Sequence, residues 1–185
     1  NEDKHMLWFL FIGTLPVVII GLLLKDKVEP ISDNPILVSI LLFLTGIILF
    51  LPVWIKNNKK IKLESRSALI IGFFQALALL PGISRSGVTI TTGMLIGVSP
   101  KKAAEFSFLL AIPAILGGTI LKMNEISSIP RNLLEIYLAG MLAAFITGLI
   151  AIFYVLKLIS RGKFAHFGFY CLLVGTTGLI YFATS

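Results

Sequence analysis

One arginine stands in an otherwise uncharged stretch of the sequence, among residue types that suit a phosphate group. Arg85 is the single charged residue between Ser67 and Val98, and it lies in segment 81–87, which reads PGISRSG. A guanidinium group offers a planar fork of N–H donors that fits phosphate oxygens. Further hydroxyl donors close to it in the sequence are Ser84, Ser86, Thr89, Thr91 and Thr92. These residue types indicate a site for a phosphate-bearing anion.

The arginine follows a break between two short apolar helices. Pro81 and Gly82 are expected to end the first helix, because proline cannot continue the hydrogen-bond ladder and glycine suits the reversal. Ser86 is predicted to cap the second helix. The free N–H groups and the positive dipole end of that helix would then face the same loop. The residues leave one alternative open, in which Arg85 bonds loop carbonyls and holds the broken helix together.

Two other polar residues are candidates for the same site. Gln75 falls in the first half-helix, where it either binds substrate or joins helices by a hydrogen bond. Glu105 falls in the second turn of a helix predicted to begin at Ser99–Pro100. It is a site carboxylate, an ion-pair partner of Arg85, or an interfacial carboxylate that faces water. The sequence has no zinc-ligand spacing and no P-loop, so no metal ligand is assigned.

The composition places these residues in a membrane protein. Hydrophobic residues make up 57% of the 185 residues and charged residues 14%, against about 25% charged in ordinary soluble domains. The net charge is +7, but the charges lie between apolar runs, as in loops that face anionic lipid. This pattern argues against a soluble enzyme and against binding of nucleic acid.

Long uncharged runs predict the membrane-spanning helices. They are 6–24, 36–55, 106–121, 136–156 and 167–183. The two halves of 67–98 are each too short to span a bilayer, and a break at membrane depth is tolerated only inside protein or beside a water-filled cavity. We therefore predict an all-α integral membrane protein, with residues 1–185 forming a single membrane domain of about five transmembrane helices plus one re-entrant helical hairpin.

The distribution of lysine and arginine supports a hairpin that enters and leaves on one side. With that topology the basic residues on one side are Lys4, Lys56, Lys59, Lys60, Lys62, Arg66, Lys101, Lys102, Lys157, Arg161 and Lys163. The other side holds Lys25, Lys27, Lys122 and Arg131. A single crossing by 67–98 would divide them almost evenly. The positive-inside rule favours the first arrangement and makes the basic side cytoplasmic.

The segment around Arg85 resembles the second signature of the undecaprenyl-diphosphate phosphatase family of the bacitracin-resistance type. The resemblance is carried by Phe74–Thr89 and continues through Gly93–Ser99 and Ala104–Pro113. Gly13–Pro16 and Gly21–Leu23 match the family as well, so the likeness extends over nearly the whole chain.

The resemblance implies a fold of two inverted repeats, each with a re-entrant hairpin, and an enzyme of the plasma membrane of bacteria. The implied reaction is hydrolysis of undecaprenyl diphosphate to undecaprenyl phosphate and inorganic phosphate, which recycles the lipid carrier of cell-wall synthesis. Arg85 matches the family's phosphate-binding arginine, and Ser84, Ser86 and Thr89 match hydroxyl positions of the same signature. We expect Arg85, Ser84 and Ser86 to be catalytic, and Gly87, Thr89, Gln75 and Glu105 to bind substrate. A divalent cation, Mg or Ca, is also expected from the family.

The chain departs from the family in one respect. The family's first signature, with a Glu-x-x-x-Glu pair, a Pro-x-Ser-Ser segment and a histidine, does not occur in this sequence. The chain therefore matches the C-terminal two-thirds of the family and is expected to be inactive alone. It would act with a missing N-terminal segment or as a homo-oligomer. The alternative function is a prenyl-phosphate carrier or flippase without hydrolysis, because transporters also use inverted repeats and midplane sites.

Overall fold

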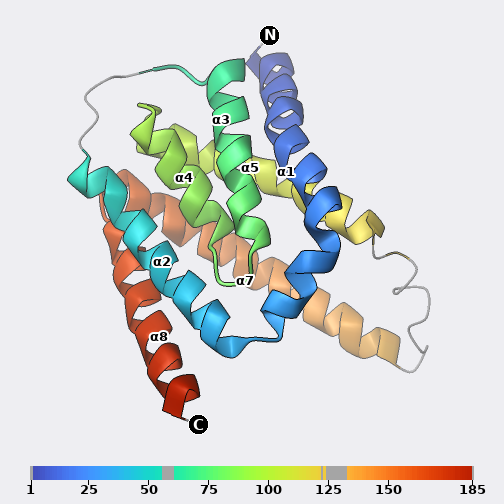
Figure 1. The fold of residues 1–185 in the computed structure, drawn as a ribbon. Coiled ribbons are helices and arrows are strands. Elements are labelled where there is room, and N and C mark those ends of the chain that lie inside the picture. The colour runs from blue at the N-terminus through green and yellow to red at the C-terminus, as the bar shows by residue number, and fades with distance from the viewer. Residues whose placement is uncertain (1, 56–60, 122, 124–132, 185) are drawn as a thin grey trace.

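The computed structural model describes residues 2–55, 61–121, 123 and 133–184, and the regular structure within these residues is helical. The helices in chain order (Figure 1) are α1 (Glu2–Ser32), α2 (Pro35–Trp54), α3 (Ser65–Gln75), the 3₁₀ helix η1 (Ala76–Leu79), α4 (Arg85–Leu95), α5 (Pro100–Leu121), α7 (Leu134–Ser160) and α8 (Ala165–Thr184). The predicted all-α fold is confirmed for this part of the chain.

Five of the described helices are long and apolar enough to cross a membrane, namely α1, α2, α5, α7 and α8. Their outer sides expose large apolar residues, such as Leu23 on α1 and Phe145 on α7 with exposed fractions of 75% and 63%. An apolar surface of this extent is unfavourable in water and suits the hydrocarbon of a bilayer. The five predicted runs thus correspond to five candidate membrane spans of a multi-pass protein.

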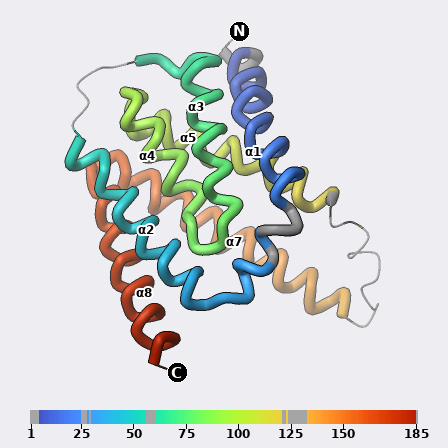
Figure 2. The backbone as a smooth tube through the Cα atoms, in the orientation of Figure 1, coloured from blue at the N-terminus to red at the C-terminus, as the bar shows by residue number. Residues whose placement is uncertain are grey.

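The segment between α2 and α5 forms a helical pair instead of a sixth long helix. α3 and η1 lead into a turn at residues 80–84, and α4 runs back beside them (Figure 2). The break is where the sequence predicts it. The second helix begins at Arg85, earlier than a cap at Ser86 would place its start, so the arginine is the first helical residue and not part of the loop.

α1 packs closely against the first half of this hairpin. A Cβ atom on Gly72 of α3 would collide with the carbonyl oxygen of Gly13 on α1, and a Cβ on Gly13 would lie 3.2 Å from the carbonyl oxygen of Ala68. Two glycines at the crossing let the two backbones touch. Ala68 and Ile71 of α3 and Phe106 of α5 are fully buried in one cluster. Residues of α1 pack against this cluster, so α1, α3 and α5 share one core.

α2 forms the other wall of the hairpin and pairs with α8. Leu49 of α2 lies in a second buried cluster with Ile90 of α4, Ala103 of α5 and Ile159 of α7. A Cβ atom on Gly175 of α8 would lie 2.7 Å from the amide nitrogen of α2's Phe43, which shows how closely these two helices approach. The hairpin is therefore enclosed by helices on several sides.

Many of the described basic residues lie at one end of this arrangement, whereas Lys25 and Lys27 lie near the end of α1. The Ile61 amide donates to the carbonyl of Gly97 at 3.0 Å, which joins the segment before α3 to the end of α4. Val98 and Ala103 pack with Ile159 and Phe164, which brings the start of α5 to the end of α7. The basic residues at this end are Lys62, Arg66, Lys101, Lys102, Lys157, Arg161 and Lys163. This agrees with the predicted charge bias. Lys56, Lys59, Lys60, Lys122 and Arg131 lie outside the described residues.

Candidate functional site

The turn that precedes Arg85 is fitted tightly against α2. Gly82 has a φ of +99°, a conformation that favours glycine. A Cβ atom at this position would collide with the carbonyl oxygen of Val38 and would lie 2.9 Å from the Cβ of Leu41. The Ile83 amide donates to the carbonyl of Leu80 at 3.1 Å and closes the turn. Glycine is thus required here both for its φ and for the approach to α2.

Thr45 of α2 bonds this turn on both sides. Its hydroxyl accepts a hydrogen bond from the Ser84 amide at 3.1 Å, and its proton is shared between the carbonyl oxygens of Gly82 at 3.0 Å and Leu41 at 3.1 Å. Thr45 is completely buried. Thr45 is not among the site residues predicted from the sequence. The available signal was a lone threonine in the middle of the uncharged run 36–55, where a hydroxyl needs a partner.

The cap of α4 differs from the prediction. Ser84, and not Ser86, is the N-cap: its φ and ψ are −72° and 113°, and its Oγ accepts from the Gly87 amide at 3.2 Å. Both serines suit a cap by type. Ser84 takes this position because its amide is bonded to Thr45. The first helical residue is therefore Arg85, which directly follows Ser84. Ser86 falls in the first helical turn.

Arg85 retains an unused donor beside the start of α4. The residue is half-buried, and its Nη1 atom is buried without a hydrogen-bond partner among the described residues. The first N–H groups of a helix also lack acceptors within the helix. A buried charged donor without a partner is unfavourable, so native structures generally supply one. This end of α4 therefore has the donors that an anion needs.

Gln75 presents the second unpartnered polar group of the hairpin. It lies at the end of α3 with 1% of its surface exposed, and neither its Nε2 nor its Oε1 atom has a hydrogen-bond partner in the described structure. The predicted alternative, a hydrogen bond that joins helices, is therefore not present among these residues. A carboxamide with both atoms unpaired is suited to binding a polar ligand.

Thr89 and Gly87 hold α4 against its neighbours. The Thr89 hydroxyl is 1% exposed, donates to the Arg85 carbonyl at 2.8 Å and pairs with the Ser107 hydroxyl of α5 at 2.5 Å. A Cβ atom on Gly87 would lie 2.8 Å from Cδ1 of Leu49, so glycine permits close packing of α4 on α2. The structure thus places both residues in the support of the turn that carries Arg85.

The Thr89–Ser107 pair allows a stability prediction. Thr89→Val should lower the free energy of unfolding by about 1–3 kcal/mol, because it leaves the buried Ser107 hydroxyl without its Thr89 partner. Ser107→Ala should cost only about 1 kcal/mol, because the Thr89 hydroxyl keeps its bond to the Arg85 carbonyl. The double variant should lose roughly 1 kcal/mol less than the sum. Reversible unfolding in mixed detergent micelles, followed by helix content, measures all four proteins. Strictly additive losses would show that the two hydroxyls do not interact.

Glu105 is not the ion-pair partner of Arg85 in the described structure. Its carboxylate lies 3.9 Å from the Nζ of Lys101, one turn earlier on α5, and both side chains are exposed, at 45% and 71%. Exposed pairs of this kind contribute roughly 0–1 kcal/mol. The structure therefore brings together Ser84, Arg85, Ser86, Gly87 and Thr89 at the start of α4 and leaves Glu105 on an exposed face.

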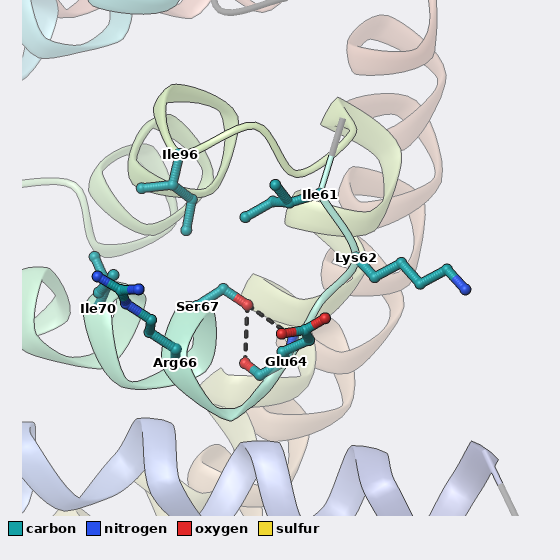
Figure 3. Close-up of a pocket in the computed structure, with 7 residues that line it drawn as sticks. All are labelled: Ile61, Lys62, Glu64, Arg66, Ser67, Ile70 and Ile96. Atoms are coloured by element: carbon teal, nitrogen blue, oxygen red, sulfur yellow. Dashed lines mark hydrogen bonds between the residues drawn. The ribbon is translucent and has the colours of Figure 1, made fainter. Parts of the chain in front are cut away.

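A cavity of about 630 Å³ lies at the other end of the hairpin (Figure 3). Its lining residues are Ile61, Lys62, Glu64, Arg66, Ser67, Ile70 and Ile96. Ser67 is engaged by Glu64, since its hydroxyl accepts from the Glu64 amide and donates to the Glu64 carbonyl, both at 2.8 Å. None of the predicted site residues lines this cavity. The candidate site remains the start of α4.

The described residues do not fit a divalent cation. Such ions prefer carboxylate and carbonyl oxygens, and no group of three His, Cys, Asp or Glu residues that could hold a metal occurs in the part of the chain that the structure describes. The side chains next to Arg85 in the sequence are hydroxyls. As far as it is described, the site offers hydrogen-bond donors that suit an anion.

The chain matches a known protein family along most of its length. The family model described as bacitracin resistance protein BacA matches residues 1–177. An undecaprenyl-diphosphatase of Korarchaeum cryptofilum is 41% identical over 95% of this chain and 66% of its own length. One of Methanobrevibacter smithii is 40% identical over 93% of this chain and 63% of its own length, and one of Bacteroides fragilis is 37% identical over 97% and 70%.

The match covers nearly all of this chain but only part of each relative. The chain spans about two thirds of the length of these relatives. The family match covers nearly every residue, including the turn and helix that carry Arg85. The chain therefore belongs to the bacitracin resistance protein BacA family.

Proposed function

We propose that the protein hydrolyses undecaprenyl diphosphate to undecaprenyl phosphate and inorganic phosphate, and so returns the lipid carrier to cell-wall synthesis. The relatives named above are undecaprenyl-diphosphatases. The observation that carries the proposal is the buried Nη1 of Arg85, which has no partner among the described residues, at the start of α4. A diphosphate group supplies the acceptor oxygens that this donor lacks.

The proposed mechanism depends on positioning and charge neutralisation. In the net hydrolysis, an oxygen of water is added to the terminal phosphorus and the bond from that phosphorus to the bridging oxygen breaks. The bridging oxygen leaves with undecaprenyl phosphate, the terminal phosphorus becomes inorganic phosphate, and the protons of the water go to the products and the solvent. Arg85 holds the oxygens of the terminal phosphoryl group and stabilises their charge as the bridging bond breaks. The unpaired amides at the start of α4 add further donors.

The neighbouring side chains have secondary roles in this proposal. The Ser84 hydroxyl accepts from Gly87, so its own proton is free for a phosphate oxygen. Ser86 lies in the first turn of α4, where its hydroxyl contributes another donor. The buried carboxamide of Gln75 donates to the second phosphate. Thr89 and Gly87 keep the start of α4 in position.

The membrane arrangement follows from the same proposal. The hairpin of α3 and α4 is re-entrant and carries Arg85 from the basic, cytoplasmic end to membrane depth, within one half of an inverted-repeat fold. The prenyl tail lies along the exposed apolar helices. The protein resides in the plasma membrane as a multi-pass protein, with residues 1–185 forming one membrane domain.

We further propose that this chain needs a second component for turnover. A divalent cation, Mg or Ca, would be held by ligands outside the described residues. The attacking group would come from a segment with the family's first signature. The chain alone would then bind undecaprenyl diphosphate without hydrolysing it.

Phosphate release tests the proposed function. The purified protein in detergent is given undecaprenyl diphosphate, alone and after addition of the first-signature segment of the Korarchaeum cryptofilum relative. Arg85→Ala is the control in both cases. The expected result is binding by the chain alone and phosphate release only with the added segment, both lost in Arg85→Ala. Transport of a prenyl phosphate across vesicles without phosphate release would favour the carrier or flippase instead.

A further inference from the structure

We infer that Thr45 is a positioning residue for Arg85, although it lies on α2 and far from the arginine in the sequence. This inference rests on the proposed function for its effect on substrate, while the contact itself is part of the fold. Thr45 is completely buried, and its hydroxyl bonds both the Ser84 amide and the Gly82 carbonyl. It therefore bonds the turn at its middle and at its last residue, just before Arg85.

The contact restrains the residue immediately before the arginine. Ser84 is the N-cap of α4, so its amide is not part of the helical hydrogen-bond ladder and needs an acceptor from elsewhere. Thr45 provides that acceptor at 3.1 Å. The Ser84 amide is thus bonded to α2, and the Ser84 hydroxyl accepts from the Gly87 amide within α4. These two bonds together fix the direction of the backbone at Arg85.

α2 presents a continuous face to the hairpin around this contact. Val38, Leu41, Thr45 and Leu49 recur at helical spacing on α2, and each approaches the segment from Gly82 to Gly87. Val38, Leu41 and Leu49 pack close to Gly82 and Gly87, where a Cβ atom would not fit. Thr45 supplies the directional bonds on this face. A hydroxyl is needed because apolar surroundings offer no water to replace it.

Substitution at Thr45 separates this role from simple packing. Thr45→Val keeps the shape and removes the hydroxyl, which leaves the Ser84 amide without an acceptor. Thr45→Ser keeps the hydroxyl and loses a methyl group. Ser39→Ala is the matched control, because Ser39 is also buried on α2 but donates to Pro35 within its own helix at 2.7 Å. All variants are first compared with the parent protein for a single peak in gel filtration.

Two readouts are measured on each variant. The first is hydrogen exchange of the amides in residues 82–88, read by mass spectrometry. The second is equilibrium binding of radiolabelled undecaprenyl diphosphate in detergent. In Thr45→Val we expect exchange to be about tenfold faster and binding to be about ten- to a hundredfold weaker. Thr45→Ser and Ser39→Ala should remain within about threefold of the parent in both readouts.

The outcomes distinguish this inference from the proposed function. Unchanged exchange and binding in Thr45→Val would overturn the inference, and so would faster exchange with unchanged binding. Equal losses in Thr45→Val and Ser39→Ala would show a general weakening of α2 and would also overturn it. If the parent protein itself bound no undecaprenyl diphosphate, the proposed function would fail. The exchange of residues 82–88 would then decide alone whether Thr45 holds the turn.

Discussion

Replacing Arg85 with lysine is expected to lower phosphate release from undecaprenyl diphosphate by roughly 10²–10³-fold in the preparation supplemented with the first-signature segment. Lysine keeps the positive charge but offers a single ammonium group in place of a planar fork of donors. The loss should lie mainly in turnover, because the fork is matched to the phosphoryl oxygens whose charge must be held as the bridging bond breaks. Arg85→Ala should lose at least as much.

Arg66→Lys is the matched control for this prediction. Arg66 lies near the start of α3 and lines the cavity at the other end of the hairpin, away from the turn that carries Arg85. The same chemical change there should leave phosphate release within about twofold, since substitutions away from a specific contact rarely exceed about 0.5 kcal/mol. Turnover by Arg85→Lys that matched Arg66→Lys would remove Arg85 from the proposed mechanism.

Gly72→Ala should have the largest effect on the fold. The added Cβ would collide with the carbonyl oxygen of Gly13, and its other near neighbours are also backbone atoms of that residue. A side chain can rotate away from such a contact, but the backbone of α1 cannot. Overpacking of a core costs about 1–3 kcal/mol where side chains can adjust, so we expect a loss of at least about 3 kcal/mol. Unfolding in detergent, or a failure to purify as a single species, measures it.

Gly148→Ala is the corresponding control on an open helix face. Gly148 of α7 has nothing within 4 Å of the position a Cβ would take. Alanine has a higher helix propensity than glycine by roughly 0.8–1.0 kcal/mol, so this variant should be as stable as the parent or slightly more stable. A destabilisation of Gly72→Ala no greater than that of Gly148→Ala would show that α1 and α3 do not meet as described.

The sequence alone predicted the elements of the site and where they begin and end to within a few residues. The uncharged runs correspond to five long apolar helices, and Pro81 and Gly82 marked the turn between α3 and α4. These predictions succeeded because they depend on local properties: the apolar character of a run, the missing amide of proline, and the freedom of glycine. The assignment of Arg85 to an anion site drew on the same local chemistry and stays a prediction until binding is measured.

Other features were decided by contacts between segments far apart in the chain. Sequence reasoning placed the cap at Ser86, whereas the bond from Thr45 to the Ser84 amide places it at Ser84. It offered Arg85 as a partner for Glu105, whereas the carboxylate lies near Lys101 on its own helix. It gave Thr45 no role at all. Local patterns were compatible with either outcome in each case.

The physical reason for this difference is that residue types along a run specify local structure, whereas the packing of helices specifies contacts between distant segments. Residue types along a run determine whether it forms a helix in a membrane, because the backbone must satisfy its own hydrogen bonds there. They do not determine which helix faces meet. The meeting of Gly13 with Gly72 and of Thr45 with the turn depends on how α1 and α2 pack on the hairpin. The sequence by itself determined the helices and the break beside Arg85, and the tertiary structure decided what holds that break in place.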